Sequence, residues 1–305
     1  MAALLEGRTA LITGAGHGIG QAHALELARH GASVVVNDLG TSVSGEGSGR
    51  DADVVVDAIV AMGGKAVADY GDVGDEGDAE AMVTRAIDAW GHLDVLVNNA
   101  GIVRDRAIWN MEADDFDAVM RVHVRGSWLT SRAVARHWRH RAKSGESLAG
   151  RIINTTSGAG LQGNFGQSNY ATAKAALTGL TMTLSVELGS IGCTANLIGP
   201  GALTRLSATT GLPDPTEPMD LGPDDWSEFD PRMSSPVVAW LASTASAGVS
   251  GQCFRVMGEH LHWMQGWREH VSISNGGRHW DAVTLARTLE TDVFGTRVPG
   301  LRLCV

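Results

Sequence analysis

Basic residues are scarce in this sequence, and lysine is the scarcest of them. Only three of the 24 basic residues are lysines, no basic block occurs in the chain, and the formal net charge is −10. Binding of a nucleic acid depends on clustered positive charge that neutralises backbone phosphates. The charge pattern therefore argues against nucleic acid as a partner.

Cysteine and long hydrophobic runs are also lacking. The three cysteines, Cys193, Cys253 and Cys304, lie far apart without metal-ligand spacing, so we expect neither a disulfide framework nor a metal site. No apolar run reaches the roughly 18 residues that span a bilayer. The apolar N-terminus lacks the basic flank of a signal peptide. We expect a soluble cytoplasmic protein with no membrane partner.

Strand-like and helix-like segments alternate along most of the chain, whose 305 residues are 44% hydrophobic. Apolar runs predict strands at 9–13, 33–37, 65–68, 95–97, 151–155, 193–198 and 253–256. Helical spacing is found at 19–30, 52–62, 76–90, 112–142, 168–189 and 234–243. Apolar strands alternating with helices predict a parallel sheet covered on both faces, and right-handed crossovers make it doubly wound. We predict an α/β fold with a single doubly wound domain over residues 1–258.

Three segments interrupt or follow this pattern. Residues 40–50 form a Gly/Ser-rich insert, and residues 204–232 are rich in proline and acidic side chains. Because the second segment has little apolar area to bury, we expect it to be a mobile lid that orders over substrate, with a surface loop as the alternative. Residues 259–305 are expected to be an extension that packs on the domain or on a neighbouring subunit.

A glycine-rich sequence directly follows the first predicted strand and opens a helix. It reads Thr13-Gly14-Ala15-Gly16-His17-Gly18-Ile19-Gly20. In this context Gly14 permits a tight turn, while Gly18 and Gly20 allow close approach to a pyrophosphate and packing of the helix. The N-terminus of that helix favours phosphate. A glycine-rich turn without a ligand is the alternative.

The charge at the end of the second predicted strand indicates which dinucleotide is bound. Asp38 ends the run VVVND, and no arginine lies within the next few residues. A carboxylate there accepts hydrogen bonds from the adenosine ribose and repels a 2′-phosphate. We therefore expect NAD as the cofactor, with a loop-capping role for Asp38 as the alternative.

Other strand ends contribute further cofactor candidates. Asp72 and Val73 follow the third strand, and Asn98-Asn99-Ala100-Gly101 follows the fourth. The two asparagines have the alternative of capping a turn. The expected cofactor-binding set is Gly14, Gly16, His17, Gly18, Ile19, Gly20, Asp38, Asp72, Val73, Asn99, Ala100, Gly101, Tyr170, Lys174, Pro200 and Gly201.

Three residues are the candidates for catalysis. Ser157 follows the fifth strand, Tyr170 comes thirteen residues later, and Lys174 lies four residues further on. The spacing puts Tyr170 and Lys174 on one helix face. A nearby ammonium lowers the pKa of a phenol, so Tyr170 is expected to exchange the proton while Ser157 holds the substrate oxygen. A packed tyrosine and an exposed lysine are the alternative.

These motifs together resemble the short-chain dehydrogenase/reductase family over roughly residues 6–258. The resemblance implies a Rossmann-like domain, hydride transfer with NAD(P), a small-molecule substrate, and a homodimer or homotetramer. A narrower resemblance is to the (3R)-hydroxyacyl-CoA dehydrogenase part of peroxisomal multifunctional enzymes of type 2, carried by VVVNDLG, NNAGIVRDRAI, RVHVRGSW and GNFGQSNYATAK. It implies an acyl-CoA substrate of a fatty-acid or sterol side-chain pathway.

Two features qualify the narrower resemblance. His123 stands where many family members have an asparagine that supports a proton-relay water. We expect it to replace that asparagine structurally, with a packed helix histidine as the alternative. The acidic lid is an unusual surface for coenzyme A. Arg104 and Arg106 are candidates for contact with its phosphates, with solvated surface residues as the alternative.

Other functions remain open at this point. A hydroxysteroid dehydrogenase or another secondary-alcohol dehydrogenase has the same catalytic residues. A 3-oxoacyl carrier-protein reductase is disfavoured by Asp38, because such enzymes usually use NADPH. A non-catalytic NAD-binding protein has no need of the Tyr170–Lys174 pair.

Overall fold

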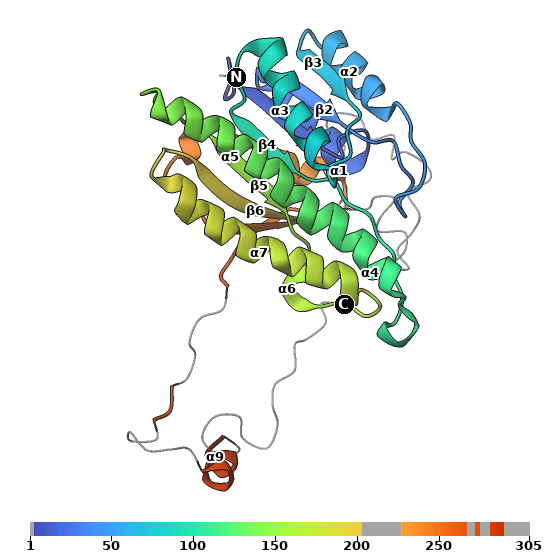
Figure 1. Cartoon of the computed structure of the whole chain (residues 1–305), viewed down its shortest axis with the longest axis vertical. Helices are drawn as coiled ribbons and strands as arrows, with labels where there is room; N and C mark the ends of the chain where they lie inside the picture. The colour runs from blue at the N-terminus through green and yellow to red at the C-terminus, as the bar shows by residue number, and fades with distance from the viewer. Residues whose placement is uncertain (1–2, 203–226, 228, 267–271, 275–280, 290–305) are drawn as a thin grey trace. The chain divides into compact units, whose positions relative to one another are not determined.

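A single eight-stranded sheet forms the centre of the first unit of the chain, which runs to Met264 (Figure 1). The structure is a computed structural model that describes residues 3–202, 227, 229–266, 272–274 and 281–289. The strands are β1 (Thr9–Thr13), β2 (Ser33–Asn37), β3 (Lys65–Asp69), β4 (Val95–Asn98), β5 (Arg151–Thr155), β6 (Thr194–Gly201), β7 (Cys253–Met257) and β8 (His260–Met264). Their order is β3-β2-β1-β4-β5-β6-β7-β8, and all neighbours pair in parallel except β7 and β8.

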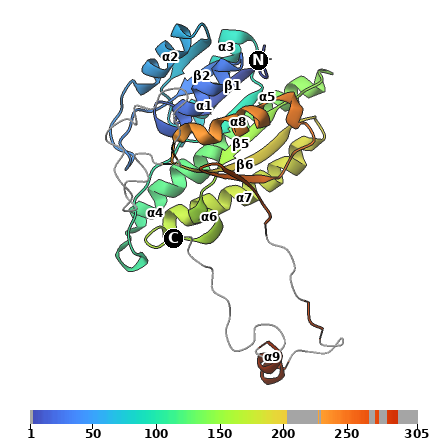
Figure 2. The same cartoon turned by 180° about the vertical axis from the view of Figure 1, so that it is seen from behind.

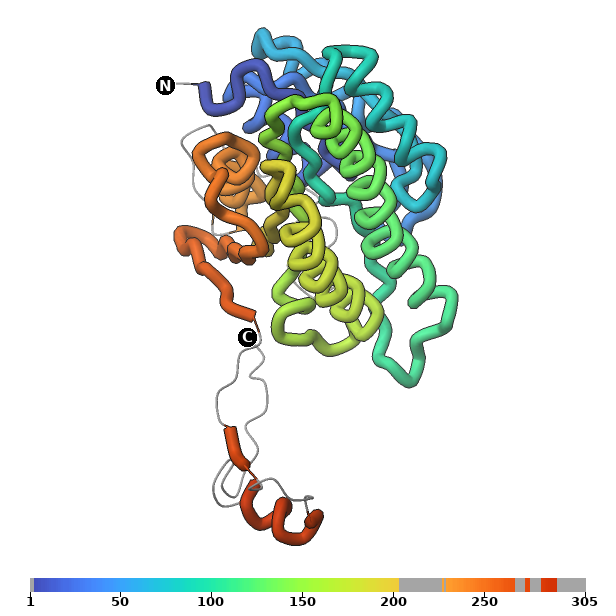
Figure 3. Tube along the Cα trace, turned by 60° about the vertical axis from the view of Figure 1, so that its left-hand side comes forward, coloured from blue at the N-terminus to red at the C-terminus, as the bar shows by residue number. Residues whose placement is uncertain are grey.

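Helices cover both faces of the sheet because its strands are apolar on both sides. On one face α1 (Gly18–Arg29), α2 (Asp51–Ala61) and α8 (Ser235–Ala242) bury Leu27, Ile59 and Val238 against Ile12 and Val34 (Figure 2). On the other, α3 (Glu76–Trp90), α5 (Ser127–Lys143) and α7 (Ser168–Gly189) bury Met82, Trp138 and Leu184 against Leu11 and Val35. Figure 3 shows α7 beside α5 along this second face. The predicted doubly wound α/β fold is confirmed.

The helix expected over residues 112–142 has a more complex course. It consists of α4 (Ala113–Met120), a π-helical segment (Arg121–Gly126) and α5 in direct succession. Apolar periodicity does not distinguish a single π turn from the α-helix around it, because the turn adds only one residue to the ladder. A short helix, α6 (Gly158–Gln162), follows β5 and precedes α7.

The sheet extends beyond the expected end of the domain. β8 follows residue 258 and pairs antiparallel with β7, so this hairpin crosses the boundary expected at residues 258 and 259. The second unit begins at Gln265, and α9 (Ala282–Thr288) is its described helix. Of the expected lid, only residue 227 and residues 229–232 are among those described, so its proposed mobility lies outside the described residues. Among the described residues, no helix is long and apolar enough to cross a membrane.

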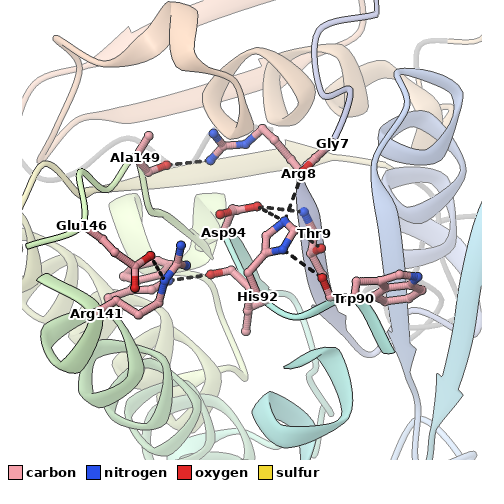
Figure 4. Close-up of polar contacts among 11 residues, drawn as sticks. Gly7, Arg8, Thr9, Trp90, His92, Asp94, Arg141, Glu146 and Ala149 are labelled. Carbon is pink, nitrogen blue, oxygen red and sulfur yellow. Dashed lines mark hydrogen bonds and ion pairs between the residues drawn. The ribbon is translucent and has the colours of Figure 1, made fainter. Parts of the chain in front are cut away.

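Polar contacts at the amino-terminal edge of the sheet tie neighbouring strands together (Figure 4). Asp94 accepts from the Thr9 amide at 3.0 Å and lies 3.2 Å from His92 Nε2, while His92 Nδ1 lies 3.0 Å from the Trp90 carbonyl. Arg8 donates to the Ala149 carbonyl at 2.6 Å. These contacts align the starts of β1, β4 and β5, and they lie at the end of the sheet opposite the glycine-rich loop.

His23 joins α1 to α8 inside the core. It is fully buried, and its Nδ1 lies 2.8 Å from the Ser235 hydroxyl. Burial disfavours the imidazolium and lowers the pKa of His23 to about 3.

This lowered pKa predicts a specific loss of stability in acid. Below pH ~6.5 the unfolded chain takes up a proton at His23 that the folded chain excludes, so stability falls as the pH falls toward 3. Between pH 6.5 and pH 4.5 the cost is about 2 kcal/mol. Urea unfolding across this range should show a shallower pH dependence for His23→Gln than for the native chain. The exposed His140→Gln is the control and should keep the native slope; a native slope in His23→Gln would contradict the assignment.

Candidate functional site

The glycine-rich loop between β1 and α1 packs directly against the loop that follows β4. Gly14 has a φ of +62°, and a Cβ placed on it would lie 2.6 Å from the Ala100 Cα. A Cβ on Gly20 would lie 2.2 Å from the Gly14 carbonyl oxygen. Both positions therefore need glycine, Gly14 for its conformation as well as its contacts and Gly20 for its contacts.

Asn99 and Thr13 hold these two loops together. The Asn99 side-chain amide donates to the carbonyls of Thr13 at 3.1 Å and Gly14 at 2.9 Å. The Thr13 hydroxyl accepts from the backbone amide of Asn99 at 3.1 Å. Asn98 instead is buried and donates to Ser131 and Asn154, tying β4 to α5 and β5. The role of Thr13 was not predicted, because a threonine at a strand end carries no distinctive signal.

Asp38 lies at the carboxyl end of β2 and faces the glycine-rich loop. One carboxylate oxygen accepts from the Gly16 amide at 2.7 Å and the other accepts from the Gly40 amide at 2.8 Å. Asp51, at the start of α2, comes close to it: a Cβ placed on Gly16 would lie 2.8 Å from both the Asp38 Cγ and the Asp51 Cβ. Asp51 also pairs with His17 at 2.9 Å. Asp38 lines the cavity at this end, while the Asp51 carboxylate turns to His17.

A cavity of about 1010 Å³ opens above these strand ends. Asp72 lines it after β3 and is held by Arg121 Nη2 at 2.8 Å and by the Gly74 amide at 2.7 Å. The residues expected to bind cofactor that line the cavity are Gly14, His17, Gly18, Ile19, Gly20, Asp38, Asp72, Val73, Asn99, Ala100 and Gly101. Its size, its glycine-lined base and its acidic end match an extended dinucleotide. The residues present therefore fit such a cofactor.

The remaining expected cofactor residues lie outside the wall of this cavity. The Gly16 amide donates to Asp38. Pro200 and Gly201 end β6, where Pro200 pairs with Val256 of β7. Tyr170 and Lys174 lie on α7. Among the described residues, no group of histidine, cysteine and acidic side chains is arranged to hold a metal ion.

Ser157, Tyr170 and Lys174 come together where β5 ends and α7 begins. Ser157 caps α6 and also hydrogen-bonds the Tyr170 side chain. Lys174 Nζ donates to the Thr155 carbonyl at 2.7 Å and lies 5.6 Å from the centre of the Tyr170 ring. The Thr156 hydroxyl donates to the backbone carbonyl of Lys174 at 3.0 Å. The lysine is thus held inside the protein, in contrast to the alternative of an exposed side chain.

Burial changes the protonation of both α7 residues. It raises the pKa of Tyr170 to about 12, with the hydrogen bond from Ser157 acting in the opposite direction. Burial lowers the pKa of Lys174 to about 7. The expected lowering of the phenol pKa by Lys174 is therefore not found in this structure, because loss of solvent outweighs the effect of the neighbouring groups.

His123 links the cavity to the reaction residues. It lies in the π-helical segment, is buried, and places Nε2 within 3.1 Å of the Ile102 amide and 2.9 Å of its carbonyl. Its ring packs edge-on against Tyr170 with centroids 5.2 Å apart. Burial, followed by the charge of Lys174, lowers the pKa of His123 well below its usual value. A neutral imidazole thus braces Tyr170 against the loop that lines the cavity.

The two arginines considered for phosphate contact share one acidic partner. Arg106 Nε lies 3.0 Å from Asp115 Oδ2, and Arg104 Nη1 lies 3.8 Å from Asp115 Oδ1. Arg104 also donates to the Ser44 carbonyl of the Gly/Ser-rich insert at 3.1 Å. Leu39, Thr41, Ser42, Val43 and Gly45 of that region line the cavity, a role that sequence analysis did not predict because the insert has no ligand-binding motif.

Comparisons with known proteins agree with this geometry. Residues 8–211 match the family described as short chain dehydrogenase. The chain is 41% identical over 302 residues to the hydroxyacyl-CoA dehydrogenase ChsB1 of Mycobacterium tuberculosis, covering 97% of this chain and 91% of that protein. It is 42% identical over 237 residues to the peroxisomal multifunctional enzyme type 2 of Mus musculus, covering 77% of this chain and 30% of that longer protein. The crystal structure of a short chain dehydrogenase from Mycobacterium avium superposes with a TM-score of 0.86 at 43% identity, covering 98% of this chain and 99% of that one.

Proposed function

This chain belongs to the short chain dehydrogenase family of oxidoreductases, which bind a nicotinamide cofactor, and from that membership we propose an NAD-dependent dehydrogenase that acts on (3R)-3-hydroxyacyl-CoA. One observation carries the catalytic part of the proposal. Ser157, Tyr170 and Lys174 meet at the carboxyl end of β5, and His123 connects Tyr170 to the wall of the dinucleotide cavity.

Each of the three residues has a distinct role in the proposed reaction. A bound nicotinamide would supply the acceptor for the hydride that leaves the carbinol carbon. Ser157 holds the substrate oxygen through its hydroxyl, and Tyr170 removes the hydroxyl proton as the carbonyl forms. Lys174, held by the Thr155 carbonyl, supplies positive charge beside Tyr170 and is the candidate to bind the nicotinamide ribose.

Tyr170 and Lys174 are proposed to titrate as one coupled pair. Burial brings the pKa of Lys174 to about 7, so the pair loses its first proton close to neutrality. The pair that remains contains one proton fewer, and this form includes phenolate beside ammonium as well as phenol beside amine. We propose that the phenolate of this form is the active base.

The acidic end of the cavity supports NAD rather than NADP. Asp38 lines the cavity and is held by two backbone amides, which fix its carboxylate there. A 2′-phosphate brought to this end meets the negative charge of Asp38, whereas a ribose hydroxyl donates a hydrogen bond to it.

The substrate class rests on the relatives. The Mycobacterium tuberculosis relative is named as a hydroxyacyl-CoA dehydrogenase and covers nearly the whole chain, and the peroxisomal relatives contain a matching part within a longer protein. The test is NAD reduction with (3R)- and (3S)-3-hydroxyacyl-CoA thioesters and with hydroxysteroids. We expect turnover of the (3R) thioesters alone; hydroxysteroid oxidation without thioester oxidation would replace this proposal with a hydroxysteroid dehydrogenase.

We also propose that the chain forms a homodimer or homotetramer. Met182 and Val186 on α7 are 56% and 80% exposed, which leaves apolar surface for a second copy to cover. Light scattering during gel filtration measures the mass directly, and a monomer at micromolar concentration would refute this part of the proposal.

Cofactor preference is tested at Asp38. Asp38→Ala removes a charge that repels the 2′-phosphate, so the ratio of kcat/KM with NADP to that with NAD should rise about tenfold or more, equivalent to roughly 1.4 kcal/mol. Asp57→Ala removes the same charge from the exposed face of α2 and should leave the ratio unchanged. Native protein that uses NADP as well as NAD would refute the assignment.

The chemical step is tested at Tyr170. Tyr170→Phe keeps the ring against His123 but removes the proton acceptor, so kcat should fall on the order of 100-fold or more while NAD affinity and folding are kept. In the native enzyme, alcohol oxidation should rise with pH through an apparent pKa below that of free tyrosine, because the deprotonated pair is the base. Lys174→Met should move that midpoint upward, since the cation that favours phenolate is lost. Near-native turnover by Tyr170→Phe would overturn the mechanism.

A further inference from the structure

The Gly/Ser-rich insert between β2 and α2 closes on itself. Gly49 donates its amide to the Leu39 carbonyl at 3.2 Å, and a Cβ placed on Gly40 would lie 2.1 Å from the Gly49 nitrogen. The backbones of Gly40 and Gly49 thus touch and form the neck of a loop. Residues 41–48 start and end at this neck. The connection from β2 to α2 could therefore be made without them.

The tip of this loop is fastened to the far side of the cavity. The Val43 carbonyl accepts from the Val103 amide at 3.0 Å, and the Ser44 carbonyl accepts from Arg104 Nε at 3.1 Å. A Cβ on Gly45 would lie 3.2 Å from the Ile102 side chain. All three contacts are made by the loop after β4, roughly sixty residues away in the sequence.

Strand order shows what lies beneath the loop. β1 stands between β2 and β4 in the sheet, so the glycine-rich loop that follows β1 lies between the neck and the fastening point. Thr41, Ser42 and Val43 line the same cavity as Gly14 and Gly18. The insert therefore crosses from one side of the cavity to the other, above the part of the site that faces phosphate.

From this arrangement we propose that residues 40–49 are a strap that binds over the middle of the dinucleotide and must unfasten for the dinucleotide to enter or leave. The proposal rests on the proposed NAD dependence. The strap contacts the cofactor through Thr41, Ser42 and the backbone, and its fastening to Ile102, Val103 and Arg104 sets the rate of release. The loop after β4 also contacts His123 through Ile102, and His123 packs against Tyr170. The closed strap therefore also steadies His123 behind Tyr170.

The fastening is weak enough to open. It consists of two hydrogen bonds to loop carbonyls and one contact with an isoleucine side chain. Val43 is the single large apolar side chain of the strap, and its other residues are serine, glycine, threonine and one glutamate, which bury little apolar surface. Loss of the bond from the charged Arg104 should therefore be measurable, at about tenfold in rate.

The experiment compares two arginine variants and an excised loop. Arg104→Gln and Arg106→Gln both lose a contact with Asp115, but only Arg104 donates to the strap. A third chain lacks residues 41–48 and joins Gly40 to Gly49, which the touching backbones permit. NADH release is followed by stopped-flow fluorescence during displacement by excess NAD, and amide exchange of residues 41–48 is measured with and without NAD in the native chain.

We expect NADH release to be about tenfold faster in Arg104→Gln and faster still in the excised chain, with a native rate in Arg106→Gln. Amides of the strap should gain protection when NAD binds. Equal release rates in the native chain and Arg104→Gln, or unchanged strap exchange on NAD binding, would overturn the strap and leave the proposed function intact. A native chain that does not bind NADH would overturn both. If the excised chain does not fold, the two arginine variants still decide the matter.

Discussion

Lys174 is a buried cation whose ammonium donates to the end of β5, and the reaction site is organised around that contact. That contact, together with the apolar packing of α7 against the sheet, holds Tyr170 next to Ser157. Removal from solvent also lowers the pKa of the lysine to about 7. Burial of Lys174 therefore underlies both its position and its pKa.

The cofactor side of the site depends on close contact between loops from different strands. The glycine-rich loop and the Gly/Ser-rich insert each contact the loop after β4, with Asn99 and Arg104 as the polar ties. Asp38 puts a carboxylate at one end of the cavity, and glycines line its base. The two halves meet at His123, whose neutral ring contacts Ile102 on one side and Tyr170 on the other.

Much of this arrangement could be predicted where the chemistry depends on local spacing. The four-residue step from Tyr170 to Lys174 lies within one helix, and Gly14 through Gly20 lie within one strand-to-helix turn, so the geometry of each follows from the element itself. The alternation of apolar strands and helices likewise predicted the doubly wound sheet. Prediction was weaker for β8 and for the π turn at His123, because an exposed edge strand and a one-residue widening leave little trace in apolar periodicity.

The sequence alone determined the fold class, the strand ends at which polar residues gather, and the residue types available for proton exchange. Only the tertiary structure decided that burial raises the pKa of Tyr170 and lowers that of Lys174, that Asp51 stands beside Asp38, and that the insert crosses the cavity to reach Arg104. The reason is that solvent exclusion and contact between distant segments depend on how the layers pack. Local spacing carries information about neighbours along one helix or turn, but none about the dielectric environment or the partner that another strand brings into place.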